Sequence, residues 1–215
     1  MSEIVFPTLN PRGLILVLSA PSGAGKSTIA RAILDQDDKV TLSVSTTSRP
    51  KRADEIDAVD YNFVIKAQFR QDINAGAFLE HAYVFEHYYG TPRAPIDRAL
   101  DAGQDVLLDI DWQGTQQLSK SVIKDLVRVF ILPPSLEELR NRLVKRAQDT
   151  HEVIDERMTK AIDEISHYKE YDWIVINHSF ELCLRQIQAI ITSERLKRQR
   201  LRRVDDFVSD LCAAS

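Results

Sequence analysis

A run of small residues that ends in a lysine and two hydroxyl residues is the stretch of this sequence best suited to hold a phosphate. Residues 19–28 read Ser-Ala-Pro-Ser-Gly-Ala-Gly-Lys-Ser-Thr, between an apolar run at 14–18 and a helical stretch at about 26–34. In such a strand–loop–helix context, backbone N–H groups and the start of the helix converge on a phosphate, as in a P-loop. The strict pattern begins with glycine, and Ala20 stands at that position. An incidental Gly–Lys–Ser at a helix start is the alternative, and the flanking elements argue against it.

The P-loop predicts an ATP site. Lys26 should bridge the β- and γ-phosphates, and the hydroxyl of Ser27 should face Mg²⁺. A carboxylate for the metal is expected at the end of a neighbouring strand, and Asp109 and Asp111 follow the apolar residues 106–108. Asp109 could hold Mg²⁺ through water, although either aspartate alone could be a strand-end or helix-capping residue. We expect ATP contacts from Ala20, Pro21, Ser22, Gly23, Ala24, Gly25, Lys26, Ser27 and Thr28.

The segments around this loop alternate between strand and helix. Apolar runs at 106–108, 127–132 and 173–176 predict further strands, and residues 135–146 and 152–169 predict helices. This alternation indicates an α/β fold with a parallel sheet flanked by helices. Residues 41 to about 91, with short β-like pieces such as 61–65, interrupt it and predict an inserted substrate-binding subdomain. A second irregularity at 147–151 predicts a mobile lid.

Composition narrows the possible partners. The 215 residues carry a net charge of -4, which argues against a general nucleic-acid binder. No apolar run approaches the roughly 18 residues that a membrane span needs, and the N-terminus does not read as a signal peptide. Cys183 and Cys212 fit no metal or disulfide spacing, so we expect thiols in a cytoplasmic enzyme. The basic run at 194–203 favours a solvated helix face over a binding patch.

Several further motifs, in order along the chain, make the sequence resemble the guanylate kinases of the bacterial type. They lie at residues 19–27, 43–61, 79–82 (Leu-Glu-His-Ala), 88–91 (Tyr-Tyr-Gly-Thr), 108–114 and 142–157. The resemblance covers residues 13 to 203. It implies a P-loop NTPase core at 13–44 and 92–203, a lid around 142–157, a mixed α/β GMP-binding subdomain at 45–91, and a C-terminal tail at 204–215. It also implies phosphoryl transfer from ATP to GMP, with Mg²⁺.

The resemblance also assigns residues to the GMP site. Arg49, Arg52, Tyr61 and Tyr89 match the family's two arginines and two tyrosines that hold the GMP phosphate, and planar guanidinium groups suit that task. Glu80 matches the residue that reads guanine, because one carboxylate can accept from both N1–H and the 2-amino group. Core packing is the alternative for the aromatic rings. The remaining positions that match the GMP site are Ser45, Thr91, Glu55 and Asp111.

The predicted lid carries Arg142, Arg146 and Arg157. The resemblance gives the last two, together with Lys26, the task of neutralising the transferring phosphoryl group, whereas ion pairing on a helix surface is the plausible alternative for Arg142. Asn177 matches a position near the adenine of ATP.

The sequence departs from the family at glycine positions that Asp54, Ala58, Glu86 and Ala147 occupy. Wherever such a position needs a positive φ, the side chain costs roughly 1 kcal/mol.

Two other functions fit the same fold. One is a related kinase for a sugar phosphate such as a ribose phosphate, but Glu80 and Ser45 would then have no base to read. The other is a non-catalytic, guanylate-kinase-like binding module, which would not need Lys26, Ser27, Asp109 or the lid arginines. The oligomeric state stays open.

Overall fold

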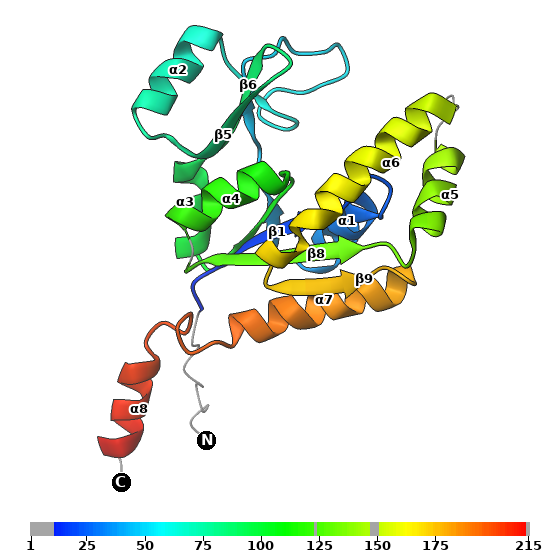
Figure 1. The fold of residues 1–215 in the computed structure, drawn as a ribbon. Helices are drawn as coiled ribbons and strands as arrows, with labels where there is room; N and C mark the ends of the chain where they lie inside the picture. Colours follow the sequence, from blue (N-terminus) through cyan, green and yellow to red (C-terminus); the bar gives the residue numbers. More distant parts are fainter. Residues whose placement is uncertain (1–10, 123, 147–150, 214–215) are drawn as a thin grey trace.

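The computed structural model describes residues 11–122, 124–146 and 151–213. Its core is a five-stranded parallel sheet with the order β2-β7-β1-β8-β9 (Figure 1). These strands are β1 (Ile15–Ser19), β2 (Val40–Leu42), β7 (Asp105–Leu108), β8 (Leu126–Leu132) and β9 (Trp173–Ile176). The α/β fold with a parallel sheet, predicted from the alternating pattern, is therefore confirmed.

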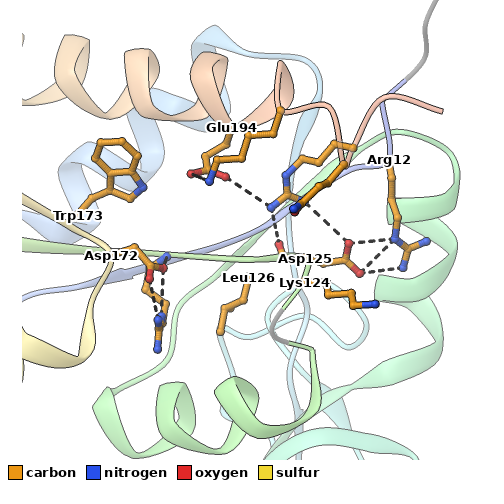
Figure 2. A pocket seen from close by; sticks show the side chains of 11 residues that line it. Arg12, Lys124, Asp125, Leu126, Asp172, Trp173 and Glu194 are labelled. Carbon is orange, nitrogen blue, oxygen red and sulfur yellow. Dashed lines mark hydrogen bonds and ion pairs between the residues drawn. The ribbon is translucent and has the colours of Figure 1, made fainter. Parts of the chain in front are cut away.

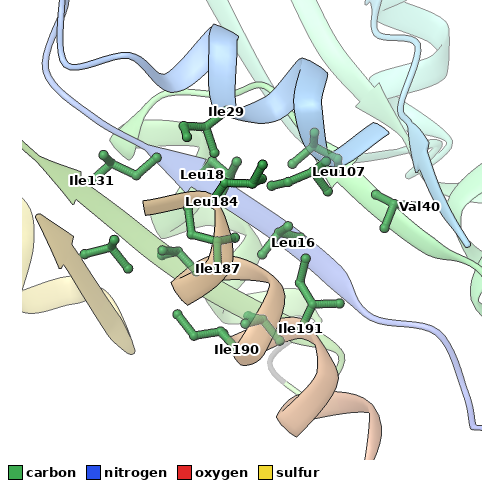
Figure 3. Close-up of a cluster of buried hydrophobic side chains, with 14 of the residues drawn as sticks. Leu16, Leu18, Ile29, Val40, Leu107, Ile131, Leu184, Ile187, Ile190 and Ile191 are labelled. Carbon is green, nitrogen blue, oxygen red and sulfur yellow. The ribbon is translucent and has the colours of Figure 1, made fainter. Parts of the chain in front are cut away.

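Helices cover both faces of this sheet because alternate strand residues point to opposite sides. Leu16 and Leu18 on β1 pack with α1 (Lys26–Gln36) and α7 (Phe180–Arg195) on one face, and Figure 3 shows Ile29, Ile187 and Ile191 around them. Ile15 and Val17 point to the other face, which α3 (Arg93–Asp101) and α4 (Trp112–Ser121) cover.

A second sheet has the order β4-β3-β6-β5 and is mixed, since β3 pairs parallel with β4 and antiparallel with β6. Its strands are β3 (Thr46–Thr47), β4 (Asn62–Phe63), β5 (Phe78–Val84) and β6 (His87–Pro92), with α2 (Lys66–Asn74) beside them. Phe69 of α2 stacks between Phe78 and Tyr88, at centroid distances of 4.4 and 5.2 Å. The side chain of Gln117 on α4 joins this sheet to the core, because its amide bonds both the N–H and the C=O of His81.

The remaining helices lie at the two ends of the core. α5 (Leu136–Arg146) and α6 (His151–Ser166) pack on each other through Leu139, Leu143, Ile154 and Met158. The helix predicted to reach residue 169 is interrupted, because a 3₁₀ turn, η1 (His167–Glu170), follows α6. No helix in the described part of the chain is long and apolar enough to cross a membrane.

The prediction of a solvated helix face at 194–203 is wrong. α7 ends at Arg195, turns follow, and α8 (Val204–Ala213) begins only after them. Arg200 is only 6% exposed and lies between the carboxylates of Asp125 and Glu194, while Arg195 pairs with Asp37 and Asp105. Arg195 and Arg200 are drawn to aspartates that lie far away in the sequence, and the spacing of charges along the chain cannot reveal such pairs.

Candidate functional site

The carboxyl ends of β1, β7, β8 and β9 meet at one edge of the parallel sheet, and the P-loop lies there. Gly23 and Gly25 both have positive φ, 91° and 101°, so the loop uses conformations that favour glycine. Ala20, which replaces the first glycine of the strict pattern, is not among the residues with positive φ and packs against the core. The substitution therefore causes no backbone strain.

Asn177 supports this loop from the end of β9. Its Nδ2 donates to the carbonyl of Ala24 at 2.7 Å, and its own N–H donates to the carbonyl of Leu132. A Cβ on Gly25 would lie 2.6 Å from Nδ2, so only glycine fits here. The structure thus places Asn177 beside the predicted ATP loop as a buried support, 7% exposed.

Lys26 begins α1 and forms an ion pair with Asp109, which follows β7. The side chains of Ser27 and Thr28 on the first turn are exposed. Lys26, Asp109, Asp111 and Glu164 line a cavity of about 180 Å³ next to the loop. The described residues contain no group of three or more His, Cys, Asp or Glu side chains that could hold a metal. A few oxygen donors beside a phosphate site nevertheless fit Mg²⁺, which keeps several waters and substrate oxygens as ligands.

Glu164 on α6 is a residue that sequence reasoning missed. Its Oε2 accepts a hydrogen bond from the backbone N–H of Ser22 at 3.1 Å. A P-loop N–H is the kind of group that donates to a phosphate oxygen, so the carboxylate of Glu164 accepts a hydrogen bond that a bound phosphate would accept. The pattern of 152–169 predicted only a helix, and no spacing in it marked Glu164.

Glu80 on β5 is the buried carboxylate of the second sheet, at 8% exposure. Its Oε1 accepts from the hydroxyl of Thr91 on the paired strand β6, and its Oε2 lies near Gly114 at the start of α4. Burial, with a smaller contribution from Asp111, raises the pKa of Glu80, and the bond from Thr91 opposes that change. Within the described residues, the groups that act on the Glu80 carboxylate are Thr91 and Asp111, and neither is basic.

Arg49 lies next to β3 and forms a two-point ion pair with Glu55. Its Nη1 and Nη2 donate to the two carboxylate oxygens at 3.1 and 2.5 Å, and the N–H of Arg52 donates to the same group. These bonds hold the pKa of Glu55 below its usual value. The guanidinium lies 5.6 Å from the ring of Tyr61, whose centroid is 6.2 Å from that of Tyr89. Arg49, Glu55, Tyr61 and Tyr89 are thus brought together.

The other predicted GMP residues are more scattered. Ser45 is half-buried beside β3, where its carbonyl accepts from the N–H of Asn62, and the side chain of Arg52 is exposed. Asp111 caps α4, since its Oδ1 accepts from the N–H of Gly114 at 2.9 Å. The helix-capping alternative for Asp111 is therefore confirmed, while Asp109 is engaged by Lys26.

The predicted lid arginines occupy α5 and α6. Arg142 pairs with Glu138 one turn earlier, as the surface alternative predicted, and also donates to the carbonyl of Asn177 at 3.3 Å. Arg157 is half-buried on α6. Arg146 ends α5, and its side chain, like residues 147–150, lies outside the described part. α5 touches the P-loop, because Leu139 and Leu143 surround the position that a Cβ on Gly23 would occupy.

At two of the positions where the family has glycine and this chain does not, the backbone adopts a conformation that favours glycine. Ala58 and Glu86 have φ values of 62° and 65°, and Phe85 beside Glu86 has 47°. Asp54 is not among the residues with positive φ, and Ala147 lies outside the described residues. Among the three of these positions that the structure describes, strain is thus restricted to two exposed turns of the second sheet.

The parallel sheet, the loop between β1 and α1, and the lysine–carboxylate pair at its end define a P-loop nucleotide-binding protein. Comparison with known proteins narrows this class. The family model for guanylate kinase matches residues 12–194. A guanylate kinase from Paramagnetospirillum magneticum is 53% identical over 205 residues, covering 95% of this chain and 96% of that protein.

A guanylate kinase from Zymomonas mobilis is 54% identical over 189 residues, covering 88% of both chains. The crystal structure of a guanylate kinase from Anaplasma phagocytophilum superposes with a TM-score of 0.72 at 34% identity, covering 93% of this chain and 95% of that one. The chain belongs to the guanylate kinase family.

Proposed function

We propose that this guanylate kinase binds ATP at the P-loop, binds GMP against the second sheet, and reads the guanine base with Glu80. The reaction, transfer of a phosphoryl group from ATP to GMP, follows from the family. In this proposal, residues 13–44 and 92–203 form the P-loop core with a lid around 142–157, and 45–91 form the GMP-binding subdomain. Residues 204–215 form a C-terminal extension that contains α8.

The observation that carries the GMP site is the buried carboxylate of Glu80. Burying a carboxylate without a basic partner is unfavourable, and a protein keeps such a group where a ligand completes its hydrogen bonds. Guanine offers two adjacent donors, N1–H and the 2-amino group, to a single carboxylate. Adenine presents an acceptor at N1, so AMP would leave the group unsatisfied, at a cost of about 1–3 kcal/mol. Ser45, Thr91 and Asp111 complete the base pocket.

The phosphate of GMP is held by Arg49, with Arg52, Tyr61 and Tyr89 as further donors. Glu55 contributes by fixing the guanidinium plane of Arg49 through two hydrogen bonds. Because Arg49 is already oriented, less side-chain entropy is lost when the phosphate binds.

Residues 20–28 bind ATP, with Asn177 as the support of the loop. Ser27 and Asp109 would hold Mg²⁺, which when bound supplies charge neutralisation to the β- and γ-phosphates. No general base is needed, because the attacking atom is an anionic phosphate oxygen of GMP. Lys26, Arg146 and Arg157 align the groups and neutralise the charge that develops on the transferred phosphoryl group.

The test is a coupled assay of ATP turnover with GMP, AMP, CMP, UMP and ribose 5-phosphate as acceptors. Wild type should turn over GMP and leave the other acceptors nearly untouched. Glu80→Gln should raise the KM for GMP by about 10- to 100-fold, the range for losing a hydrogen bond to a charged group. Glu181→Gln, the same change on the exposed start of α7, is the matched control.

Equal KM values for Glu80→Gln and wild type would refute the role of Glu80. Turnover with the sugar phosphate alone would favour the kinase for another acceptor. Folded protein without turnover on any acceptor would favour a binding module.

A further inference from the structure

The C-terminal helix α8 presents an apolar face that the rest of the described chain covers only in part. It stands apart from both sheets in Figure 1, and none of its residues is buried. The spacing of Val204, Phe207, Val208 and Leu211 places all four on one side of the helix, and Val208 is 49% exposed. An amphipathic helix of ten residues is marginal in water unless this face packs against something.

α8 is also acidic. Its sequence contains Asp205, Asp206 and Asp210 and no lysine or arginine. Asp206 forms an exposed ion pair with Arg203 at 3.5 Å, whereas Asp205 and Asp210 have no ion-pair partner among the described residues. A surface that receives α8 should therefore combine apolar contacts with positive charge.

A groove with these properties lies at the amino ends of β8 and β9, the sheet edge opposite the P-loop. It is a cavity of about 1010 Å³ that contains Trp173 and Leu126, as Figure 2 shows. Five basic and three acidic side chains line it, which gives a net charge of +2. The basic residues are Arg12, Lys124, Arg128, Lys197 and Arg200.

The excess positive charge of the groove comes from two residues. Arg12, Arg128 and Lys197 are neutralised by direct pairs with Asp125, Asp172 and Glu194, at 3.0, 2.7 and 2.7 Å. Lys124 is exposed. Arg200 reaches the carboxylates of two of these acids only at 3.7 and 3.8 Å, and its buried Nε has no hydrogen-bond partner among the described residues.

We propose that α8 of one copy docks in this groove on a second copy, and reciprocally, to form a symmetric dimer by helix exchange. The apolar face would cover the exposed Trp173, and the aspartates would face the exposed Lys124, with the buried Arg200 adding positive charge to the groove. A stable interface needs about 800 Å² per partner. Exchange helps to reach that area, because each copy contributes both a helix face and a groove to a two-fold interface.

The first experiment measures molecular mass against protein concentration by sedimentation velocity. Wild type should approach twice the 24.5 kDa of one chain, and the dissociation constant should rise with salt because the contacts are partly ionic. Val208→Glu should raise that constant by at least about tenfold, because it buries an unpaired charge. Ser209→Glu adds the same charge off the apolar face and should behave as wild type. A wild type that stays monomeric, or equal dissociation constants for all three proteins, would overturn the proposal.

The second experiment uses the native Cys212, which is exposed on α8, together with Lys124→Cys in the groove. Cys183 is buried, and burial raises its pKa to about 11, so it does not compete. Mild oxidation should give a covalent dimer, whereas Phe85→Cys, at a 91% exposed hairpin tip, should give none. A disulfide within single chains would show that α8 folds into its own groove, and a Lys124→Cys protein with no disulfide would equally contradict the exchange.

Discussion

Replacing Glu86 by glycine should stabilise this protein, although the side chain of Glu86 is exposed. Glu86 and Phe85 form the two-residue turn of the β5–β6 hairpin, since Val84 pairs with His87 across it. Both have positive φ, 65° and 47°, the pattern of a type I′ turn, which favours Asn-Gly. Ala58, at φ 62°, offers a second test in a separate turn.

The magnitude follows from two opposing contributions. The left-handed conformation costs a residue with a Cβ about 1–2 kcal/mol, which glycine removes. Glycine also makes the unfolded chain more flexible, which lowers the free energy of unfolding by about 0.4–1 kcal/mol. The net gain in the free energy of unfolding should be about 0.5–1 kcal/mol, or a rise in Tm of about 1–4 °C for a chain of this size. The double change Phe85→Asn and Glu86→Gly should add to it, because it restores the favoured turn sequence.

The assay is thermal unfolding followed by circular dichroism, with Asp54→Gly as the matched control. Asp54 is also exposed and also stands at a glycine position of the family, but it is not among the residues with positive φ. Glycine there should lower Tm slightly, because only the unfolded state gains freedom. If Glu86→Gly lowers Tm, or Asp54→Gly raises it equally, backbone strain is not what distinguishes these positions.

The further predictions concern three residues of the site. Because burial raises the pKa of Glu80, the KM for GMP should rise as pH falls through that raised value, and Glu80→Gln should lose this dependence in initial-rate assays. The ionised carboxylate is disfavoured in the folded state, so Glu80→Gln should also increase Tm at neutral pH. Glu164→Gln should bind a non-hydrolysable ATP analogue about tenfold more tightly in calorimetry, because a competing charged hydrogen bond is weakened, while Asp163→Asn should not. Gly25→Ala should reduce Tm and raise the KM for ATP, since its Cβ would meet Asn177 at 2.6 Å in a backbone with φ 101°.

The sequence predicted features that depend on local pattern. Buried parallel strands are continuous apolar runs, so β8 was predicted within one residue. The range of β9 was also predicted, although it is an edge strand and only Val175 of its four residues is buried. The P-loop was visible because its geometry demands small residues. The missing glycines were also readable, and two of the four positions carry positive φ.

Partners distant in the chain could not be predicted. Glu164 and Ser22 are 142 residues apart, and Arg200 and Asp125 are 75 apart, so no spacing rule connects them. The basic run at 194–203 looked like a solvated face because several carboxylate partners of its arginines, Asp37, Asp105 and Asp125, come from other segments. The helix cap at Asp111 was one alternative from the sequence, but only the fold shows that its carboxylate accepts from the N–H of Gly114.

Three groups that are expected to bind substrate phosphates are engaged by carboxylates of the protein itself. Asp109 holds Lys26, Glu164 holds the N–H of Ser22, and Glu55 holds Arg49. Without such partners, the cations and free N–H groups that face the substrate sites would be left unpaired, which would lower the stability of the substrate-free protein. At the P-loop, a phosphate that enters exchanges one anionic acceptor for another on Lys26 and on the N–H of Ser22, so the cost of desolvating these donors is already largely met in the free protein. The exchange also favours the more highly charged ligand, because a triphosphate competes better than a single carboxylate. The internal carboxylates therefore help to keep the donors in position and make the site selective for polyphosphate over weaker anions.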